Sequence, residues 1–399
     1  MMAGAHPTQL ASARLSQDFD HHDRELTPDM AVLVHRALRE GQRVAYSRAH
    51  GGMWILSRYD DVEAALKDHR TFSSAEGVLF PRTADTPRFA PLDYDPPEQA
   101  VFRELMRPPC TIGAVRRLKY DIAKLVRRVV EPLVRRGGGD LVTELAATLP
   151  LAAVSLAVGF SEDARERIAE LAAIGWTRMP SDGPAERFWP PFAELFRAEI
   201  KRAKAEPGED YLSALVRSRI DGRPVTESEL HAMLVSFAVA GHETTMNSLS
   251  HLLWQLGERP DLQSRLRGDR RLIPVAIEET LRLWSPVDHG TRVTTREVTI
   301  ADVVIPSGAR VVLLTGAANR DPRRFAAPDE FRLDRGPVHH LGFGAGIHFC
   351  IGAHLARLEF ETVLAELARH PDYRLLNRPI RYFHNGRHAC LDRLDVTWP

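Results

Sequence analysis

The sequence predicts a mainly helical protein with small β-sheets, an α+β arrangement. Two observations carry this prediction. The pattern from residue 98 to residue 256 is mainly helical, with few breaks. Short strand-like runs lie towards the two ends of the chain instead. No internal repeat is visible, which argues against a solenoid or a propeller.

Local signals define the first elements. Residues 1–25 are polar, and we expect them to be flexible. Thr27 is placed as the N-cap of the first helix, and His50-Gly51-Gly52 marks a hairpin. The elements expected in order are a helix over Pro28–Glu40, strands over Val44–Ser47 and Met53–Ser57, a helix over Asp60–Lys67, a long irregular loop over 71–97, and helices broken at Gly137-Gly138-Gly139, Met179–Pro191 and Glu206-Pro207-Gly208.

A long helix from about Glu227 to Leu256 is the strongest element of the pattern. Thr226 and Glu229 have the spacing of a capping box, and Gly257 with Pro260 marks the end. At about 1.5 Å per residue this helix spans about 45 Å, enough to cross a domain. Its middle, 240–245, contains a glycine and two threonines, which are poor helix formers. This weak point indicates either a functional site or a tolerated glycine.

The last third of the chain returns to mixed elements. Its expected order is two shorter helices after Pro260, strands over Arg292–Thr295, Val298–Ile300 and Val311–Leu314, an irregular meander over Asn319–Leu341, a helix over Ala353–His370, and a C-terminal strand over Leu394–Trp398.

Composition excludes several classes of protein. The 399 residues include 53 basic and 53 acidic side chains, so the net charge is zero and bulk attraction to nucleic acid is not expected. Three dispersed cysteines do not form a disulfide framework and fit a reducing compartment. No secretory signal is visible, and the uncharged, largely apolar stretch 146–160 is too short for a membrane span. We expect a cytoplasmic protein that binds neither membranes nor nucleic acid.

The segment His340–Gly352 carries the chemistry. Its glycines build a turn that places Cys350 at the start of a helix. Free N–H groups and the helix dipole favour an anion there, which predicts a lowered thiol pKa. The thiolate could then be a nucleophile, a redox sensor or a metal ligand, whereas an isolated cysteine is more often a small buried apolar residue. Nearby His340, His348 and His354 give only a weak zinc signal, since no second ligand pair is present.

This segment resembles the haem loop of the cytochrome P-450 superfamily, of the soluble bacterial type. Other stretches match that family in the expected order, from about residue 27 to the end of the chain. They are Phe343-Gly344-x-Gly346-x-His348-x-Cys350-x-Gly352-x-x-Leu355-Ala356-Arg357, Glu279-Thr280-Leu281-Arg282, Ala240-Gly241-His242-Glu243-Thr244-Thr245, Asp95-Pro96-Pro97-Glu98 with Arg103, Pro286-Val287 with Arg292, and Asn319-Arg320-Asp321-Pro322 with Phe331 and Arg335.

The resemblance implies one haem-centred domain over residues 26–399, preceded by the flexible segment 1–25. The cofactor would be haem b, with Cys350 as the thiolate ligand of the iron. Phe343 would pack beside the sulfur. The positions expected to let the backbone approach the sulfur and the porphyrin are Gly344, Gly346 and Gly352. The cations matched to the two haem propionates are Arg103, Arg292 and His348.

On the opposite side of the haem, the resemblance implies that Thr244 and Glu243 form an alcohol–acid pair that supplies protons for O2 activation. One is expected to face the haem and the other a solvent channel. Ala240 would border the haem, and a kink at Gly241 would make room for oxygen. Glu279, Arg282 and Arg335 resemble a structural ion-pair triad behind the haem.

The chain departs from the family pattern at several positions. Gln99 stands where many relatives have a histidine that contacts a propionate, so that hydrogen bond is in doubt. Cys110 replaces a common aromatic residue. Asp288 and His289 lie in a usually apolar stretch that faces substrate. They could bind a polar substrate group, but we favour pairing with each other.

The expected substrate pocket is formed by the 74–92 loop, the 176–196 segment, the central helix and the stretch 287–291. Its candidate lining residues are Phe80, Phe89, Val239, Ala240, Val287, Asp288 and His289, with Trp176, Phe188 and Trp189 as further aromatic candidates. Such a lining suits a small apolar or aromatic molecule, although the aromatic residues could equally be ordinary core.

An excess of positive charge predicts the electron donor. Residues 101–136 hold ten basic and three acidic side chains, a local excess of seven. In the family this region borders the thiolate side of the haem, so we expect an acidic ferredoxin with an NAD(P)H-dependent reductase to supply electrons. The predicted activity is insertion of one oxygen atom from O2 into a small organic substrate. The alternatives are a peroxide-using haem-thiolate enzyme, a non-enzymatic haem sensor and, least favoured, a zinc module.

Overall fold

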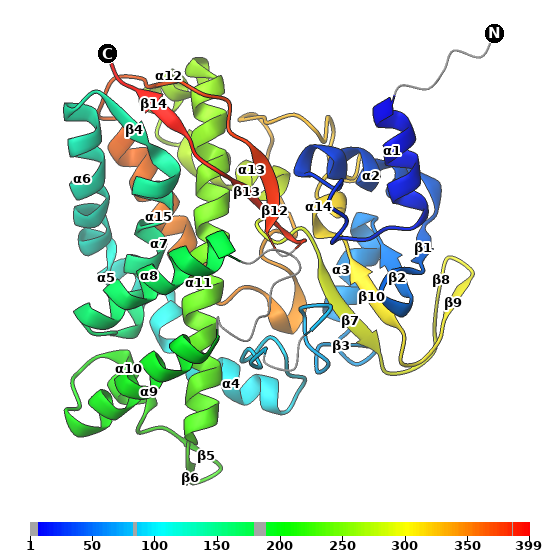
Figure 1. The fold of residues 1–399 in the computed structure, drawn as a ribbon, viewed down its shortest axis with the longest axis horizontal. Helices are drawn as coiled ribbons and strands as arrows, with labels where there is room; N and C mark the ends of the chain where they lie inside the picture. Colours follow the sequence, from blue (N-terminus) through cyan, green and yellow to red (C-terminus); the bar gives the residue numbers. More distant parts are fainter. Residues whose placement is uncertain (1–6, 83–85, 179–188, 385) are drawn as a thin grey trace.

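The computed structural model describes residues 7–82, 86–178, 189–384 and 386–399, and it is mainly helical (Figure 1). The α-helices in the described residues are α1 (Pro7–Gln17), α2 (Pro28–Gly41), α3 (Tyr59–Lys67), α4 (Glu98–Met106), α5 (Ile112–Arg117), α6 (Lys119–Arg135), α7 (Leu149–Val158), α8 (Glu162–Arg178), α9 (Trp189–Ala205), α10 (Tyr211–Leu215), α11 (Glu227–Glu258), α12 (Pro260–Gly268), α13 (Leu272–Leu283), α14 (Thr315–Ala318) and α15 (Ala353–Leu367).

The strands are short and gather into small sheets, as the sequence predicts. They are β1 (Val44–Ser47), β2 (Met53–Leu56), β3 (Phe72–Ser73), β4 (Gly138–Asp140), β5 (Arg219–Ile220), β6 (Arg223–Pro224), β7 (Gly290–Thr294), β8 (Val298–Ile300), β9 (Val303–Ile305), β10 (Arg310–Leu313), β11 (Arg374–Leu375), β12 (Arg381–His384), β13 (His388–Leu391) and β14 (Asp395–Thr397).

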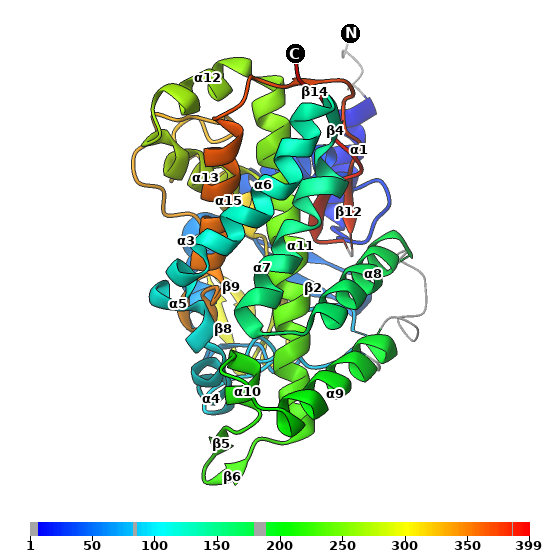
Figure 2. The same cartoon turned by 90° about the vertical axis from the view of Figure 1, so that its left-hand side faces the viewer.

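Helix α11 runs through the middle of the molecule and organises the helical part (Figures 1 and 2). The predicted capping box is present: the Thr226 hydroxyl accepts the Glu229 N–H, and the Glu229 carboxylate accepts the Thr226 N–H. The helix ends at Glu258, one residue beyond the glycine expected to stop it. Helices α7, α9, α13 and α15 pack around it, so its buried face lies within the largest hydrophobic core cluster.

The largest sheet has the order β1-β2-β10-β7-β3 and lies beside the helical part (Figure 1). β2 and β10 are parallel, and the other neighbours are antiparallel. The predicted hairpin of β1 and β2 is confirmed, as is Thr27 as the N-cap of α2, since its hydroxyl accepts the Met30 N–H. β12 and β13 form a separate antiparallel hairpin near α11.

One expectation about local structure is wrong, and another is incomplete. Residues 7–17 of the segment expected to be flexible form α1, which packs on α2; Leu15 and the following Phe19 are almost fully buried. The glycine run at 137–139 is not only a break, because Gly138–Asp140 forms β4 and pairs with β14. Among the described helices, none combines the length and apolar character needed to cross a lipid bilayer.

Candidate functional site

Cys350 lies at the end of a compact loop that leads into α15. The loop folds back on itself because the Cys350 N–H donates to the Phe343 carbonyl oxygen at 2.9 Å. Gly346–His348 form a single 3-10 turn between these residues. Cys350 is therefore held by backbone geometry two residues before Gly352, the N-cap of α15.

The environment of the Cys350 thiol combines opposing effects. Burial raises its pKa above the ordinary value, while the Gly352 N–H and the charges of Arg103 and Arg357 act to lower it. The net direction is upward, so the expected lowering at the helix start is wrong for the thiol alone. A metal ion bound to sulfur would displace the proton and reverse this balance.

Glycine is present at the different positions of the loop for different physical reasons. Gly344 and Gly346 have φ of +70° and +67°, which favours glycine. A Cβ on Gly346 would also lie 2.7 Å from the Leu66 carbonyl oxygen, so this glycine allows close contact with the end of α3. Gly352 has ordinary φ, and a Cβ there would lie 3.9 Å from Cys350 Sγ, an ordinary contact.

An ion-pair network outside the loop fixes Phe343. The Arg357 guanidinium lies 4.5 Å from the centre of the Phe343 ring and donates to Glu278 on α13, with Nε 2.6 Å from Oε1. His340 Nε2 lies 3.1 Å from the same carboxylate. Burial alone would raise the pKa of Glu278, but these hydrogen bonds outweigh it and hold the pKa at about 2.

A cationic cluster lies beside the loop. Burial, together with the charges of Arg292, Arg103 and His69, lowers the pKa of His348 to about 3. The Nδ1 of His348 is buried and has no hydrogen-bond partner in the described residues. Arg292 on β7 is also buried; its Nη1 donates to the Thr291 carbonyl oxygen at 2.8 Å, and burial lowers its pKa to about 10. The structure thus brings the three predicted cations into one neighbourhood and adds His69.

Gln99 does not contribute to this cluster. Its amide Nε2 donates to the Ile347 carbonyl oxygen at 2.8 Å, so it ties α4 to the cysteine loop. The hydrogen bond placed in doubt from the sequence is replaced by a contact within the protein.

Glu279, Arg282 and Arg335 meet as a buried trio. Arg282 Nε and Nη2 each lie 2.8 Å from an oxygen of Glu279, and Arg335 Nε lies 3.0 Å from Oε1. Arg282 also donates to the carbonyl oxygens of Asn319, Pro328 and Glu330. The trio therefore fixes the irregular segment between β10 and the cysteine loop.

On α11, Ala240 is exposed and Thr244, one turn later, is half-buried. The Thr244 hydroxyl donates to the Ala240 carbonyl oxygen at 2.7 Å, the back-bond that the sequence suggested. The helix is continuous through Gly241, and a Cβ there would lie 2.3 Å from Val154 Cγ2 on α7. Close packing against α7 therefore requires a glycine at this position.

Glu243 has partners that sequence reasoning missed. Its Oε1 lies 2.5 Å from His384 Nδ1 and its Oε2 lies 2.6 Å from His388 Nδ1. Burial alone would raise the pKa of Glu243, but the charges of His388 and His384 and the hydrogen bond with His384 outweigh it and lower the pKa. The carboxylate is 2% exposed, so it faces the β12–β13 hairpin rather than the expected solvent channel. A His-x3-His spacing was visible in the sequence, but not that it faces α11.

The expected substrate residues separate into two groups. Phe89 and the half-buried Val239 belong to the core cluster around α11, and the loop after Phe89 is tied to that helix by the Ala90 N–H, 3.3 Å from the Ala232 carbonyl oxygen. Phe80 instead packs in the N-terminal cluster, 4.1 Å below the Arg310 guanidinium.

Asp288 and His289 do not pair with each other. Asp288 Oδ2 lies 3.3 Å from Nε2 of His35 on α2, whereas the His289 ring packs edge-on against His21 with 4.5 Å between centroids. Val287, just before them, is half-buried. Of the 176–196 segment, residues 179–188 and the side chains of Trp176 and Trp189 lie outside the description.

Comparison with known proteins decides the family. The model of the family described as cytochrome P450 matches residues 187–375. Cytochrome P450 107B1 of Saccharopolyspora erythraea is 38% identical over 363 residues, which cover 86% of this chain and 88% of that protein. The chain belongs to the cytochrome P450 family. A beta-dihydromenaquinone-9 omega-hydroxylase of Mycobacterium bovis is 33% identical and covers 95% of this P450 and 78% of its own length.

Solved structures agree with this assignment. The structure of Mycobacterium marinum cytochrome P450 CYP268A2 in complex with pseudoionone has a TM-score of 0.89 and 27% identity, and the match covers 96% of this P450 and 98% of that chain. The relatives are cytochromes P450 and hydroxylases, so this P450 is an oxidoreductase of the monooxygenase class that binds haem through a cysteine thiolate.

The residues present fit a haem group. Cys350 supplies a sulfur on a backbone-fixed loop. Buried Arg292 and half-buried Arg103 offer positive charge to anionic propionates, and His348, which its lowered pKa keeps neutral, offers an unpartnered ring nitrogen. Ala240 gives α11 an exposed position with no bulky side chain.

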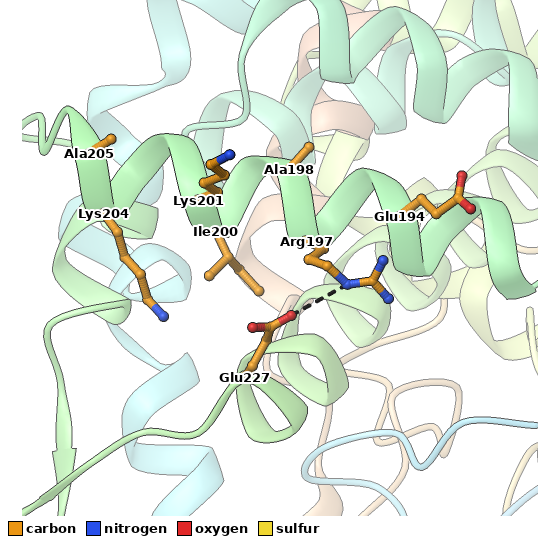
Figure 3. Close-up of a pocket in the computed structure, with 8 residues that line it drawn as sticks. All are labelled: Glu194, Arg197, Ala198, Ile200, Lys201, Lys204, Ala205 and Glu227. Atoms are coloured by element: carbon orange, nitrogen blue, oxygen red, sulfur yellow. Dashed lines mark ion pairs between the residues drawn. The ribbon is translucent and has the colours of Figure 1, made fainter.

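A surface hollow elsewhere is not part of this site. It has a volume of about 740 Å³ and lies between α9 and the start of α11, where Arg197 Nε is 3.5 Å from Glu227 Oε1 (Figure 3). Its lining is largely charged and shares no residue with the cysteine loop, with β7 or with the middle of α11. We assign no function to it.

Proposed function

We propose that this cytochrome P450 inserts one oxygen atom from O2 into a small apolar or aromatic molecule, with electrons from a separate acidic ferredoxin and its NAD(P)H-dependent reductase. Haem, when bound, supplies the iron centre at which O2 is activated. Cys350 would hold the iron, and Arg103, Arg292 and His348 would hold the propionates. Thr244 and Glu243 would deliver protons.

The proton-delivery roles follow from position on α11. Thr244 is half-buried one turn from the exposed Ala240, so its hydroxyl is available on that side of the helix. Its oxygen donates its proton to the Ala240 carbonyl and keeps lone pairs that can accept a hydrogen bond from water. Glu243, the next residue back, holds an ionised carboxylate in a buried position from which a proton can be passed.

We infer the class of substrate from the carboxylates near the expected pocket, which already face histidines of the protein. Asp288 faces His35, and Glu243 faces two histidines, so neither carboxylate is left for a polar substrate group. The neighbouring candidates Phe89, Val239 and Val287 are apolar. A cyclomarin C epoxidase of Salinispora arenicola, 33% identical, and the menaquinone hydroxylase show oxidation of organic molecules by relatives.

The observation that carries the ferredoxin proposal is an exposed basic surface on the helices that pack against α15, the helix after Cys350. We call it the basic face; its residues are Arg116, Arg117, Lys119, Lys124 and Arg128 on α5 and α6. Exposed apolar side chains accompany it, including Tyr120 at 78% exposure, Ile112 and, next to Cys350, Phe349. Charge around an apolar centre suits a transient acidic partner.

Two measurements test the proposal. A library of small apolar and polar compounds is screened for the spin-state change of the haem that accompanies substrate binding, and apolar aromatic compounds should bind most tightly.

For the electron donor, R116E combined with R128E should raise the KM for ferredoxin about 10-fold at low salt, and the difference from the wild type should disappear at high salt. R374E combined with R378E, at exposed positions before β12, is the charge-matched control. An unchanged KM and salt dependence would exclude this docking surface.

A further inference from the structure

The carboxylate of Glu243 and the two histidines of the β12–β13 hairpin form a compact cluster, which we call the Glu–His–His site. In the register of the hairpin, His384 pairs directly with His388, so both side chains leave the same end of the two strands. Both Nδ1 atoms reach the carboxylate, at 2.5 and 2.6 Å from its two oxygens. Residues from distant parts of the chain are thus brought together with little freedom to move apart.

The atoms of this site have the chemistry of a metal ligand set. Two imidazole nitrogens and one carboxylate oxygen lie within 4.8 Å of one another, and all three residues are buried. Zinc binds such ligands at about 2.0–2.2 Å, which places ligand atoms roughly 3.3 Å apart around a tetrahedral ion. The three ligand atoms already lie close to this spacing, and small side-chain rotations would let them surround an ion, with water as the fourth ligand.

A second observation points to a missing ligand. His388 Nδ1 is buried and lies 2.6 Å from Glu243 Oε2, yet it is not aligned for a hydrogen bond. An imidazole nitrogen and a carboxylate oxygen are both ligands that zinc takes, so a cation bound by both groups would satisfy this nitrogen. The His388 side chain is 10% exposed, so the site is not sealed from solvent. The positively charged Arg387 lies near Glu243 and interacts with its carboxylate. It would repel a bound cation and so lower the affinity of the site for a metal ion.

We propose that Glu243, His384 and His388 bind one divalent transition-metal ion of the zinc class, and that the bound ion inhibits oxygen activation. Zinc is favoured because it takes nitrogen and oxygen ligands and accepts four-coordination without further geometric demands. The inhibition rests on the proposed function, because a carboxylate bound to a metal cannot pass protons. Occupancy would therefore make the enzyme sensitive to free zinc.

Calorimetric titration of the haem-loaded enzyme with Zn²⁺ tests the site without turnover. We expect one equivalent to bind, and H384A and H388A should each weaken binding roughly 100-fold, the effect of losing one of a few ligands. H50A is the matched control, because Asp20, His21 and His50 form the other His-containing group in the described residues that could hold a metal. Binding that survives in H384A and H388A, or that is lost in H50A, overturns the proposal.

A second measurement stays informative if a variant folds poorly. Anomalous diffraction at the zinc edge from wild-type crystals soaked in Zn²⁺ should give a peak within bonding distance of the three side chains, and the absence of such a peak overturns the site. Inhibition is read separately, as the ratio of product formed to NADH consumed with and without Zn²⁺. If zinc binds at the site and the ratio is unchanged, the regulatory claim and the proton role of Glu243 both fail, while the metal site stands.

Discussion

The two sides of the candidate site are built in opposite ways. The cysteine loop is contiguous: Phe343 and Cys350 are joined by a backbone hydrogen bond, and the glycines between them fix the turn. The other side is assembled at long range, since Glu243 lies on α11 and its partner His384 is 141 residues further along the chain. The residues of the cysteine loop are close in the sequence, whereas the contact between Glu243 and His384 forms only after the β12–β13 hairpin has packed against α11.

Replacing Cys350 gives the largest expected effect and tests the local side alone. C350S keeps the backbone of the loop but removes the thiolate sulfur. We expect complete loss of the characteristic absorbance of the reduced, CO-bound haem-thiolate and of O2-supported turnover. C110S, at a buried position, is the matched control and should keep both. A retained thiolate spectrum in C350S would show that another residue binds the iron.

Replacing Glu279 tests the ion-pair trio that supports the segment leading to the cysteine loop. E279A leaves Arg282, which is fully buried, without its carboxylate partner. Breaking a buried ion pair costs about 3–5 kcal/mol, so the free energy of unfolding in urea should fall by that amount. D334A removes the partner of Arg332 in an exposed pair and should cost under about 1 kcal/mol. Equal effects of the two variants would contradict the structural role of the trio.

On the long-range side, T244A should separate binding from chemistry. Loss of the hydroxyl should leave the substrate-induced spin-state change intact and reduce product formation about 100-fold, with reducing equivalents released as hydrogen peroxide. Product, NADH and peroxide are measured together, and T362A, whose hydroxyl makes the same type of back-bond on α15, is the control. Tight coupling in T244A would remove the proton-delivery role from Thr244.

The smallest expected effect is a pH dependence at the network around Phe343. The folded pKa of Glu278 is about 2, below its ordinary value of 4.5, so its stabilisation is complete above pH 4.5 and is lost as pH falls towards 2. E278Q should therefore lower the free energy of unfolding by about 2 kcal/mol at pH 7 and by progressively less below pH 4.5. Urea unfolding across this range checks it, with E297Q at an exposed position between β7 and β8 as control. A difference that does not change with pH would contradict the assignment.

The sequence was sufficient where the cause of a structure is local. Thr27 and the Thr226–Glu229 box predicted helix starts correctly, and the hairpin of β1 and β2 followed from its glycine turn. Positions that depend on a distant partner were not predicted. Asp288 meets His35 rather than its neighbour, and Gly346 is required by the carbonyl of Leu66.

The candidate site shows the same division. The cysteine loop could be located from its spacing, but the partners of Glu243 could not, because a His-x3-His pair gives no information about which helix it will face. Helix α1 was missed for a related reason: its sequence is polar overall, and only packing on α2 buries Leu15. Tertiary contacts decide such weak elements.

The hydrogen bond from Gln99 to the Ile347 carbonyl oxygen has a mechanical consequence. It connects α4, which contains Arg103 and leads towards the basic face, to the backbone three residues before Cys350. The glutamine acts as a tether that holds α4 and the sulfur-bearing loop in a fixed relative position.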